Sequence, residues 1–184
     1  MEDLFTLTRA DAGQYPLSPQ EFYLDELVAD CTHAARSLAL AKQITLTCEV
    51  PEELPIRADE ALLRRMILNL LDNDIKYTPA QGRVTVTCDR AGSEYALSVT
   101  DSGPGIPADL QQRVFERFFR VDQARTRTEN DGGGAGLGLS IARWIAEAHH
   151  GRLILARSDS SGSTFTALLP AQMAVPSPTA SLTR

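Results

Sequence analysis

The pattern of apolar residues along the chain predicts three amphipathic helices. In each segment, apolar side chains recur every three or four positions, which gathers them on one face of a helix. Asp59 is a suitable N-cap for the second segment, because its carboxylate can accept a hydrogen bond from a free N–H group of the first turn. Gly151 follows the third segment and can end it. The predicted helices span residues 25–41, 59–76 and 137–150.

Five other segments alternate apolar and polar residues and are rich in β-branched side chains, a pattern typical of strands. A further short helix is predicted at residues 108–119. Helices and strands in this order favour an α+β fold. We expect a two-layer α/β sandwich in which a mixed, mostly antiparallel sheet is covered on one face by helices. The predicted strands span residues 44–50, 84–89, 95–101, 152–158 and 163–170, and the second and third of them form a hairpin.

The bulk properties of the chain narrow the possible functions. Its 184 residues suffice for one domain, and 43% apolar residues can fill a core. A net charge of -6 argues against nucleic acid as a partner, because phosphate backbones attract clustered positive charge. No apolar run reaches the roughly 18 residues of a membrane helix, so we expect no membrane contact by this segment. Cys31, Cys48 and Cys88 are too far apart for a zinc site and are expected in the core.

The second predicted helix carries a narrow polar stripe in the sequence NLLDNDIKYTP, residues 69–79. A rotation of about 100° per residue places Asn73 about 40° from Asn69 on one side and Lys76 about 20° from it on the other. Neutral amide oxygens can ligate a hydrated Mg²⁺ close to phosphates, and an ammonium group can bind phosphate. An ordinary solvated helix face can carry the same pattern, so the stripe alone does not decide between the two interpretations.

Two glycine-rich stretches add candidate ligand-binding groups. DSGPGIP (101–107) places Asp101 at the end of a predicted strand, where its carboxylate can accept a hydrogen bond from an exocyclic amine such as that of adenine. GGGAGLGLS (132–140) opens a predicted helix whose free N–H groups can hold phosphate. Each stretch alone is a weak indication, because turns and flexible loops share these compositions.

Taken together and in this order, the stretches resemble the catalytic, ATP-binding domain of bacterial sensor histidine kinases, which belongs to the ATPase class shared with gyrase, Hsp90 and MutL. NLLDNDIKYTP is similar to the N box, DSGPGIP to the G1 box, RVFERFFRVD to the F box and GGGAGLGLS to the G2 box. GSTFTALLP resembles the last strand with its preceding turn. The resemblance covers roughly residues 20–170 and implies the Bergerat ATPase fold, with ATP and Mg²⁺ as ligands.

The resemblance implies a role for each matching residue of the helix and the lid. Asn73 would ligate Mg²⁺, with Asn69 beside it. Lys76 would contact phosphate, and Tyr77 would flank the nucleotide. Arg120 would reach the γ-phosphate from the lid. The implied catalytic set is therefore Asn73, Lys76 and Arg120.

Further residues are implied to shape the purine pocket and to surround the phosphates. Asp101 would read the adenine amine, and Thr164 would lie under the adenine. Glycines would let the backbone approach the nucleotide and let the lid fold over it. The remaining implied nucleotide-binding residues are Gly103, Gly105, Ile106, Gly134, Gly136, Leu137, Gly138 and Leu139.

The resemblance also implies how the chain is organised. Residues 1–19 would be the remnant of a dimerisation helix with a linker, and residues 20–170 the ATP-binding domain with a lid at about 107–136. Residues 171–184 would form a disordered tail. The lid contains five arginines within 15 residues, which would attract a nucleotide to an otherwise acidic protein.

The implied function is two-component signalling in the cytoplasm, either free or at the cytoplasmic end of a membrane-anchored sensor. The domain would supply the γ-phosphate of Mg-ATP to a histidine of an adjacent dimerisation domain, and a response regulator would then receive it. None of His33, His149 and His150 is followed by an acid as the phosphoacceptor is, so we expect that histidine outside this chain. Two alternatives stay open: a serine kinase of the anti-sigma type with the same fold, and a nucleotide-binding module without catalysis.

Asp74 departs from the family pattern, in which a small residue such as alanine stands at this position. The helical projection puts Asp74 at about 140°, on the core face. An unpartnered buried carboxylate is costly as an anion and usually takes up a proton. Three interpretations stay open: the helix ends early so that Asp74 reaches water, Asp74 meets a buried donor, or the residue loosens the N box. We expect Asp74→Ala to stabilise the fold and to tighten nucleotide binding.

Overall fold

The computed structural model describes residues 15–121 and 136–171. Most of the expected dimerisation-helix remnant with its linker (1–19), the part of the expected lid that contains Gly134, and nearly all of the expected tail lie outside these ranges. The helices within them are α2 (Leu24–Ala41), α3 (Glu60–Tyr77) and α4 (Gly138–Ala148). The strands are β1 (Gln20–Tyr23), β2 (Thr45–Glu49), β3 (Pro55–Ala58), β4 (Arg83–Ala91), β5 (Glu94–Asp101), β6 (Arg152–Asp159) and β7 (Gly162–Pro170).

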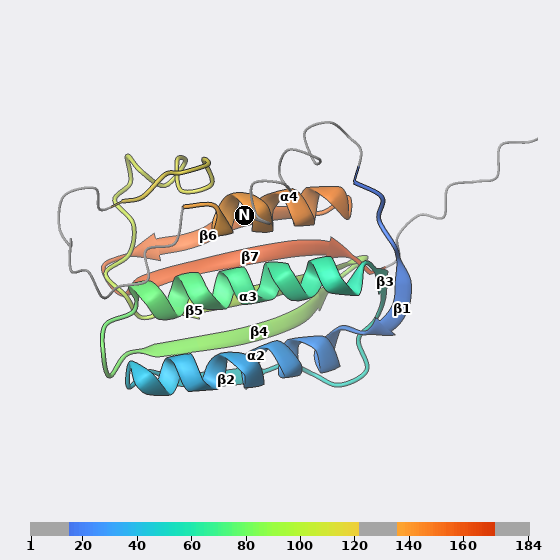
Figure 1. Ribbon diagram of the computed structural model, residues 1–184, viewed down its shortest axis with the longest axis horizontal. Coiled ribbons are helices and arrows are strands. Elements are labelled where there is room, and N and C mark those ends of the chain that lie inside the picture. The colour runs from blue at the N-terminus through green and yellow to red at the C-terminus, as the bar shows by residue number, and fades with distance from the viewer. Residues whose placement is uncertain (1–14, 122–135, 172–184) are drawn as a thin grey trace, which may run out of the picture.

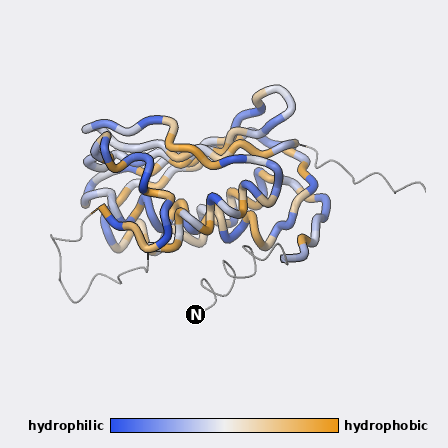
Figure 2. Tube along the Cα trace, turned by 90° about the horizontal axis from the view of Figure 1, so that it is seen from above, coloured by the Kyte–Doolittle hydropathy of each residue, from blue (hydrophilic) through white to orange (hydrophobic). Residues whose placement is uncertain are grey.

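The predicted two-layer sandwich is confirmed. Five strands form a sheet in the order β2-β4-β5-β7-β6, in which only β2 and β4 pair in parallel. The helices lie side by side over one face of this sheet (Figure 1), and an edge view separates the two layers (Figure 2). Among the described helices, none combines the length and apolar character that a bilayer span requires. Cys31 and Cys88 are buried as expected, but Cys48 is exposed on the edge strand β2, so its predicted core position is wrong.

The core lies between the sheet and α3, the central helix. Alternate side chains of β5 face this core: Tyr95, Leu97 and Val99 are buried, and Asp101 continues the same alternation as the last residue of the strand. The strand period therefore turns the carboxylate of Asp101 toward the helical layer. From the other side, α3 contributes the buried residues Leu62, Leu63, Met66, Ile67, Leu70, Leu71, Asp74 and Ile75.

Two short strands were not predicted from the sequence. Strands β1 and β3 pair antiparallel, with Phe22 opposite Ile56, in a two-stranded sheet of their own. Each strand has only four residues, and Pro55 opens β3. Four residues are too few for an alternating pattern to stand out, so only the long-range pairing reveals these strands.

The predicted short helix at residues 108–119 is wrong. The segment consists of successive turns, each closed by a backbone hydrogen bond between residues three apart. In the first turn the N–H of Leu110 donates to the carbonyl of Pro107 (2.9 Å), and Arg113, Glu116 and Phe119 donate in the same way to the residues three positions before them. Phe118 has a positive φ of 63°, which is incompatible with a continuing α-helix. Gln111 donates from Nε2 to the carbonyl of Ile106 (2.9 Å), and Phe115 packs edge-on against Phe165 of the sheet. Tertiary contacts thus override the local helical pattern.

The start of α3 is joined to the end of α4 through a buried histidine. Asp59 is the N-cap of α3, as predicted, because its Oδ1 accepts from the N–H of Leu62 (3.1 Å). The N–H of Asp59 itself donates to Nε2 of His149 (3.1 Å), while Nδ1 of His149 lies 2.8 Å from the carbonyl of Ile145. This arrangement requires a neutral imidazole with its proton on Nδ1. Burial, the largest influence, lowers the pKa of His149.

We expect the bond between His149 and Asp59 to make the fold less stable in mild acid. The unfolded chain takes up a proton at His149 near the ordinary pKa of about 6.5, whereas the folded chain resists it, so the free energy of unfolding falls as pH drops through that value. Urea unfolding at pH 7.5 and pH 5.5 measures this loss, and His149→Gln should reduce it. His150→Gln, at the exposed neighbouring position, is the control. An equal loss in all three proteins would contradict the account.

Candidate functional site

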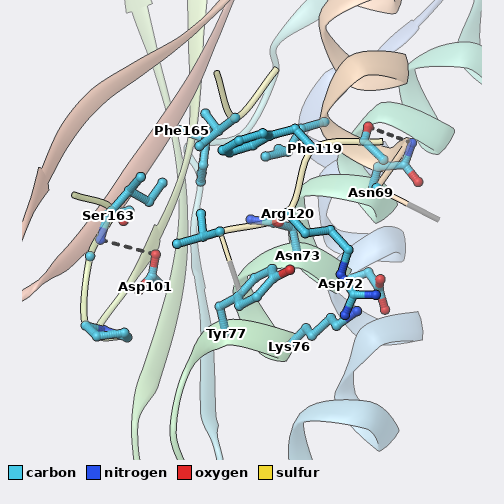
Figure 3. A pocket seen from close by; sticks show the side chains of 18 residues that line it. Asn69, Asp72, Asn73, Lys76, Tyr77, Asp101, Phe119, Arg120, Ser163 and Phe165 are labelled. Carbon is cyan, nitrogen blue, oxygen red and sulfur yellow. Dashed lines mark hydrogen bonds between the residues drawn. The ribbon is translucent and has the colours of Figure 1, made fainter. Parts of the chain in front are cut away.

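A pocket lies between the polar side of α3 and the end of the sheet, and residues on both sides of the undescribed segment 122–135 border it. Figure 3 shows Asp101 and Ser163 on the sheet side and Asn69, Asn73 and Lys76 on the helix side. The lining residues are Asn69, Asp72, Asn73, Lys76, Tyr77, Asp101, Pro104, Gly105, Ile106, Val114, Phe119, Arg120, Val121, Gly136, Gly138, Leu139, Ser163 and Phe165.

On the helix side, the predicted polar stripe faces the pocket. Asn69 donates from Nδ2 to the carbonyl of Gly138 (3.3 Å), and Asn73 donates from Nδ2 to Oδ1 of Asp74 (3.1 Å). Both bonds use the amide nitrogen, so the amide oxygen is the atom that each asparagine can offer to a cation. Lys76 adds a positive charge to the same wall.

On the sheet side, Asp101 is 7% exposed and is held by backbone donors. Its Oδ1 accepts from the N–H of Gly103, and its Oδ2 accepts from the N–H of Ser163 (3.2 Å). Burial raises the pKa of Asp101, and these two bonds act against that rise by favouring the carboxylate. A buried acceptor with a fixed orientation can select a ligand that presents an amine.

Two glycines permit the backbone to come close where the pocket wall is formed. Gly105 has φ of 72°, and a Cβ there would lie 1.9 Å from the carbonyl oxygen of Asp159. Gly136 has φ of 71°, and its carbonyl accepts from the N–H of Phe118 (2.9 Å). At both positions the glycine has a left-handed backbone conformation and lies close to the backbone of another segment, so a side chain there would be strained and would clash.

Between the two polar ends, the pocket has apolar and aromatic walls. Ile106, Val114, Phe119, Leu139 and Phe165 line this part of the cavity. Flat apolar walls with a hydrogen-bond acceptor at one end and cationic and amide groups at the other suit a planar base that carries phosphates.

The structure brings most of the predicted site residues together, with three exceptions among the described residues. Thr164 does not line the pocket: its Oγ1 lies 3.1 Å from that of Thr100, on the other face of the sheet. Because successive strand residues point to opposite faces, Ser163 takes the place predicted for Thr164. Gly103 and Leu137 also lie outside the lining, Gly103 behind Asp101 as its hydrogen-bond donor. Gly134 lies outside the described residues.

Several lining residues were missed by the sequence analysis. The helical projection itself could have found Asp72, because it stands four residues before Lys76 on the same side of α3. Strand alternation from Phe165 could have found Ser163. Phe165, two residues after Ser163, lies on the same face of the strand. Periodicity does not assign the others to the pocket, because they reach it through irregular loops, although they belong to the stretches DSGPGIP and RVFERFFRVD: Pro104, Val114, Phe119 and Val121.

Comparison with known proteins supports an assignment to a family. Residues 58–173, more than half of the chain, match the model of the histidine kinase-, DNA gyrase B- and HSP90-like ATPases. The chain belongs to this ATPase family. It is similar to the adaptive-response sensory kinase SasA of Rippkaea orientalis (35% identical, over 91% of this chain and 42% of the relative) and to the sensor-like histidine kinase SenX3 of Mycolicibacterium smegmatis (40%, over 91% and 43%). The ATPase chain thus spans less than half the length of these relatives.

Solved structures agree with the family assignment. The catalytic domain of the histidine kinase ThkA matches 84% of this chain and 97% of its own length, with a TM-score of 0.73 and 29% identity. Full-length ShkA in complex with AMPPNP matches 92% of this chain and 34% of its own, with a TM-score of 0.80 and 29% identity. The chain is therefore an ATPase domain of the histidine-kinase type.

Asp74 is buried in this ATPase domain, as the helical projection predicts. It is 0% exposed and α3 continues past it to Tyr77, so the helix does not end early to let the carboxylate reach water. Among the described residues, Oδ2 of Asp74 has no hydrogen-bond partner, and Oδ1 has only the amide of Asn73. Burial, and then the charge of Asp101, raise the pKa of Asp74 well above its ordinary value.

We expect Asp74→Ala to raise the free energy of unfolding by about 1–3 kcal/mol, the cost of a buried polar group without a full set of partners. ATP should also bind more tightly, since the substitution removes a carboxyl group that holds Asn73 and lies near Asp101. Denaturant unfolding and calorimetric titration measure the two effects. Asp72→Ala, an exposed position on the same helix, is the control for stability. Unchanged stability and affinity in Asp74→Ala would refute the prediction.

The same carboxyl group should make stability depend on pH. In the unfolded chain Asp74 ionises near pH 4, whereas in the fold its pKa is raised, so the folded state holds the proton to higher pH. The stability that depends on this proton is present below pH 4 and is lost as pH rises through the folded pKa. Asp74→Asn keeps the shape without the titration, and its advantage over the natural chain should grow from pH 4 to pH 7. A constant difference would rule out this contribution.

Proposed function

We propose that this chain is the ATP-binding catalytic domain of a sensor histidine kinase. It would supply the γ-phosphate of Mg-ATP to a histidine of an adjacent dimerisation domain, and an aspartate of a response regulator would then receive it. The observation that supports this most is the pocket itself: a buried acceptor, Asp101, and a stripe of two amides and an ammonium group border one cavity from opposite sides.

Each end of the pocket suits one part of ATP. Asp101 would accept a hydrogen bond from the adenine amine, and Ile106 would pack against the purine. Lys76 would neutralise phosphate charge, with Tyr77 beside the nucleotide. Arg120 lines the same cavity and would meet the γ-phosphate. Phosphoryl transfer depends mainly on positioning and charge stabilisation, and these are the properties that such a pocket provides.

The donor set of the pocket fits Mg²⁺ bound together with phosphates. Among the described residues, no group of three His, Cys, Asp or Glu side chains could hold a metal ion alone. Mg²⁺ usually binds through one or two protein oxygens plus waters and substrate phosphates, so the amide oxygens of Asn73 and Asn69 suffice. When bound, the ion would supply charge neutralisation at the phosphates. Asn73 and Asn69 would hold it and thereby fix the phosphate chain relative to Lys76.

The partners proposed for the chain follow from its relatives. A solved structure shows ThkA in complex with the response regulator TrrA, and 92% of this chain matches 48% of that kinase, with a TM-score of 0.70 and 25% identity. We infer a response regulator as the final acceptor here as well. The buried His149 has both ring nitrogens engaged and is unsuited to accept phosphate. Neither His33 nor His150 is followed by an acid, so the three histidines together favour an acceptor outside this chain. Because ATP is a cytoplasmic metabolite, we place the activity in the cytoplasm.

Asp101→Asn should weaken ATP binding by about tenfold or more. Both oxygens of Asp101 accept hydrogen bonds from backbone N–H groups. In asparagine an NH₂ group replaces one of these oxygens, so one backbone N–H would face another donor and the carboxylate would no longer be available to the adenine amine. Isothermal titration calorimetry with Mg-ATP measures the effect. Asp89→Asn, an exposed position on β4, is the control and should bind as the natural chain does. Equal affinities of Asp101→Asn and the natural chain would refute the role of Asp101.

Transfer of phosphate distinguishes a kinase domain from a binding module. When the chain is mixed with γ-labelled ATP and a dimerisation domain that carries an acceptor histidine, we expect acid-labile, base-stable labelling of that domain. Asn73→Ala should abolish the labelling, because Asn73 would hold the metal ion. Binding of ATP without any labelling would favour the non-catalytic alternative, and acid-stable labelling of serine would favour a serine kinase.

A further inference from the structure

Lys42 lies directly after α2 and extends its side chain to the end of α3. Its Nζ donates to the carbonyl oxygens of Ile75 (3.0 Å), Lys76 (2.6 Å) and Thr78 (3.2 Å). Helices α2 and α3 run side by side, and their C-terminal ends lie at the same end of the sheet (Figure 1). One ammonium group therefore bonds three carbonyls of a single helix terminus.

These bonds satisfy carbonyl groups at the C-terminal end of α3 that would otherwise lack hydrogen-bond partners. The last carbonyls of an α-helix have no intrahelical partner, and together they carry a partial negative charge. At the end of α3, Thr78 supplies the partner for one carbonyl, because its N–H and its Oγ1 both bond the carbonyl of Asp74 (3.0 and 2.6 Å). Lys42 satisfies three more. The C-terminal end of α3 is thus held by a side chain from outside this helix, that of Lys42.

The backbone that Lys42 holds is the backbone that carries two pocket residues. Lys76 and Tyr77 both line the pocket, and the ammonium of Lys76 lies 5.8 Å from the ring centroid of Tyr77. Lys42 itself is not among the lining residues. It binds the carbonyls on either side of Tyr77, so any shift of this turn would move both side chains relative to Asp101.

A lysine suits this position better than an arginine. Three carbonyls converge on one nitrogen, which matches the three donors of an ammonium group, whereas a planar guanidinium spreads its donors over a fork. Among the 18 basic residues of the chain, Lys42 and Lys76 are the only lysines, and all the others are arginines. Both lysines thus belong to the same end of α3.

We propose that Lys42 is a positioning residue for nucleotide binding, which holds the last turn of α3 so that Lys76 reaches the phosphates. This proposal rests on the proposed function, in which Lys76 contacts the phosphate chain. Lys42 acts through the backbone of residues 75–78 and does not touch the nucleotide. Its loss should therefore weaken the binding of the phosphates more than the binding of the base.

The test compares Lys42→Met, Lys76→Met and the double variant by calorimetric titration with Mg-ATP and with adenosine. Lys42→Met should weaken Mg-ATP about tenfold and adenosine less than about twofold. In the Lys76→Met background, Lys42→Met should cost little more, because the two residues act on the same contact. Arg36→Met, which removes an exposed positive charge from α2, is the control for net charge and should bind Mg-ATP normally.

The outcomes separate the positioning role from a purely structural role. If Lys42→Met weakens adenosine and Mg-ATP equally, or if its effect adds fully to that of Lys76→Met, the positioning role is overturned. If Lys76→Met itself leaves Mg-ATP affinity unchanged, the proposed function of Lys76 fails instead. Should Lys42→Met not fold, Lys42→Arg keeps the charge without the three-donor geometry. That variant should still lose Mg-ATP affinity relative to adenosine, and unchanged selectivity for Mg-ATP would overturn the proposal.

Discussion

Helix α3 packs leucine and isoleucine side chains against the sheet along one side and exposes Asn69, Asn73 and Lys76 to the pocket along the other. The apolar side fixes the helix at a constant position above β5, so the distance from its polar stripe to Asp101 is set by core packing. The helix must therefore keep its rotation about its own axis, and each of its ends is held accordingly.

Both ends of α3 are held by residues from other elements. At the start, Asp59 caps the helix while its own N–H bonds the buried His149 after α4. At the end, Lys42 after α2 bonds three carbonyls. Asp74 works against this arrangement, because a buried carboxyl group with one unpartnered oxygen lies in the middle of the packing side. The helix is thus held at both termini, and its buried carboxyl group without a full set of partners lies beside the pocket residue Asn73.

The sequence alone was enough to predict the sandwich, the main elements and most of the polar site, because each follows from local periodicity. The stripe of α3 and the position of Asp101 at the end of β5 needed only helical and strand spacing. The turns at 108–119 and the β1–β3 pair depend on contacts between distant residues, such as that of Phe115 with Phe165, which periodicity does not record. Thr164 was misplaced by one residue, which in a strand reverses the face. Lys42 gave no sequence indication at all, since its role exists only where α2 ends beside α3.

The most direct test of the account is a crystal structure of the chain with Mg²⁺ and a non-hydrolysable ATP analogue. The account predicts that the adenine amine lies within hydrogen-bond distance of the Asp101 carboxylate, and that the phosphates lie beside Asn69, Asn73 and Lys76. A nucleotide bound outside this pocket, or bound in it with the phosphates at Asp101, would contradict the central claim that one ATP molecule joins the sheet side to the helix side.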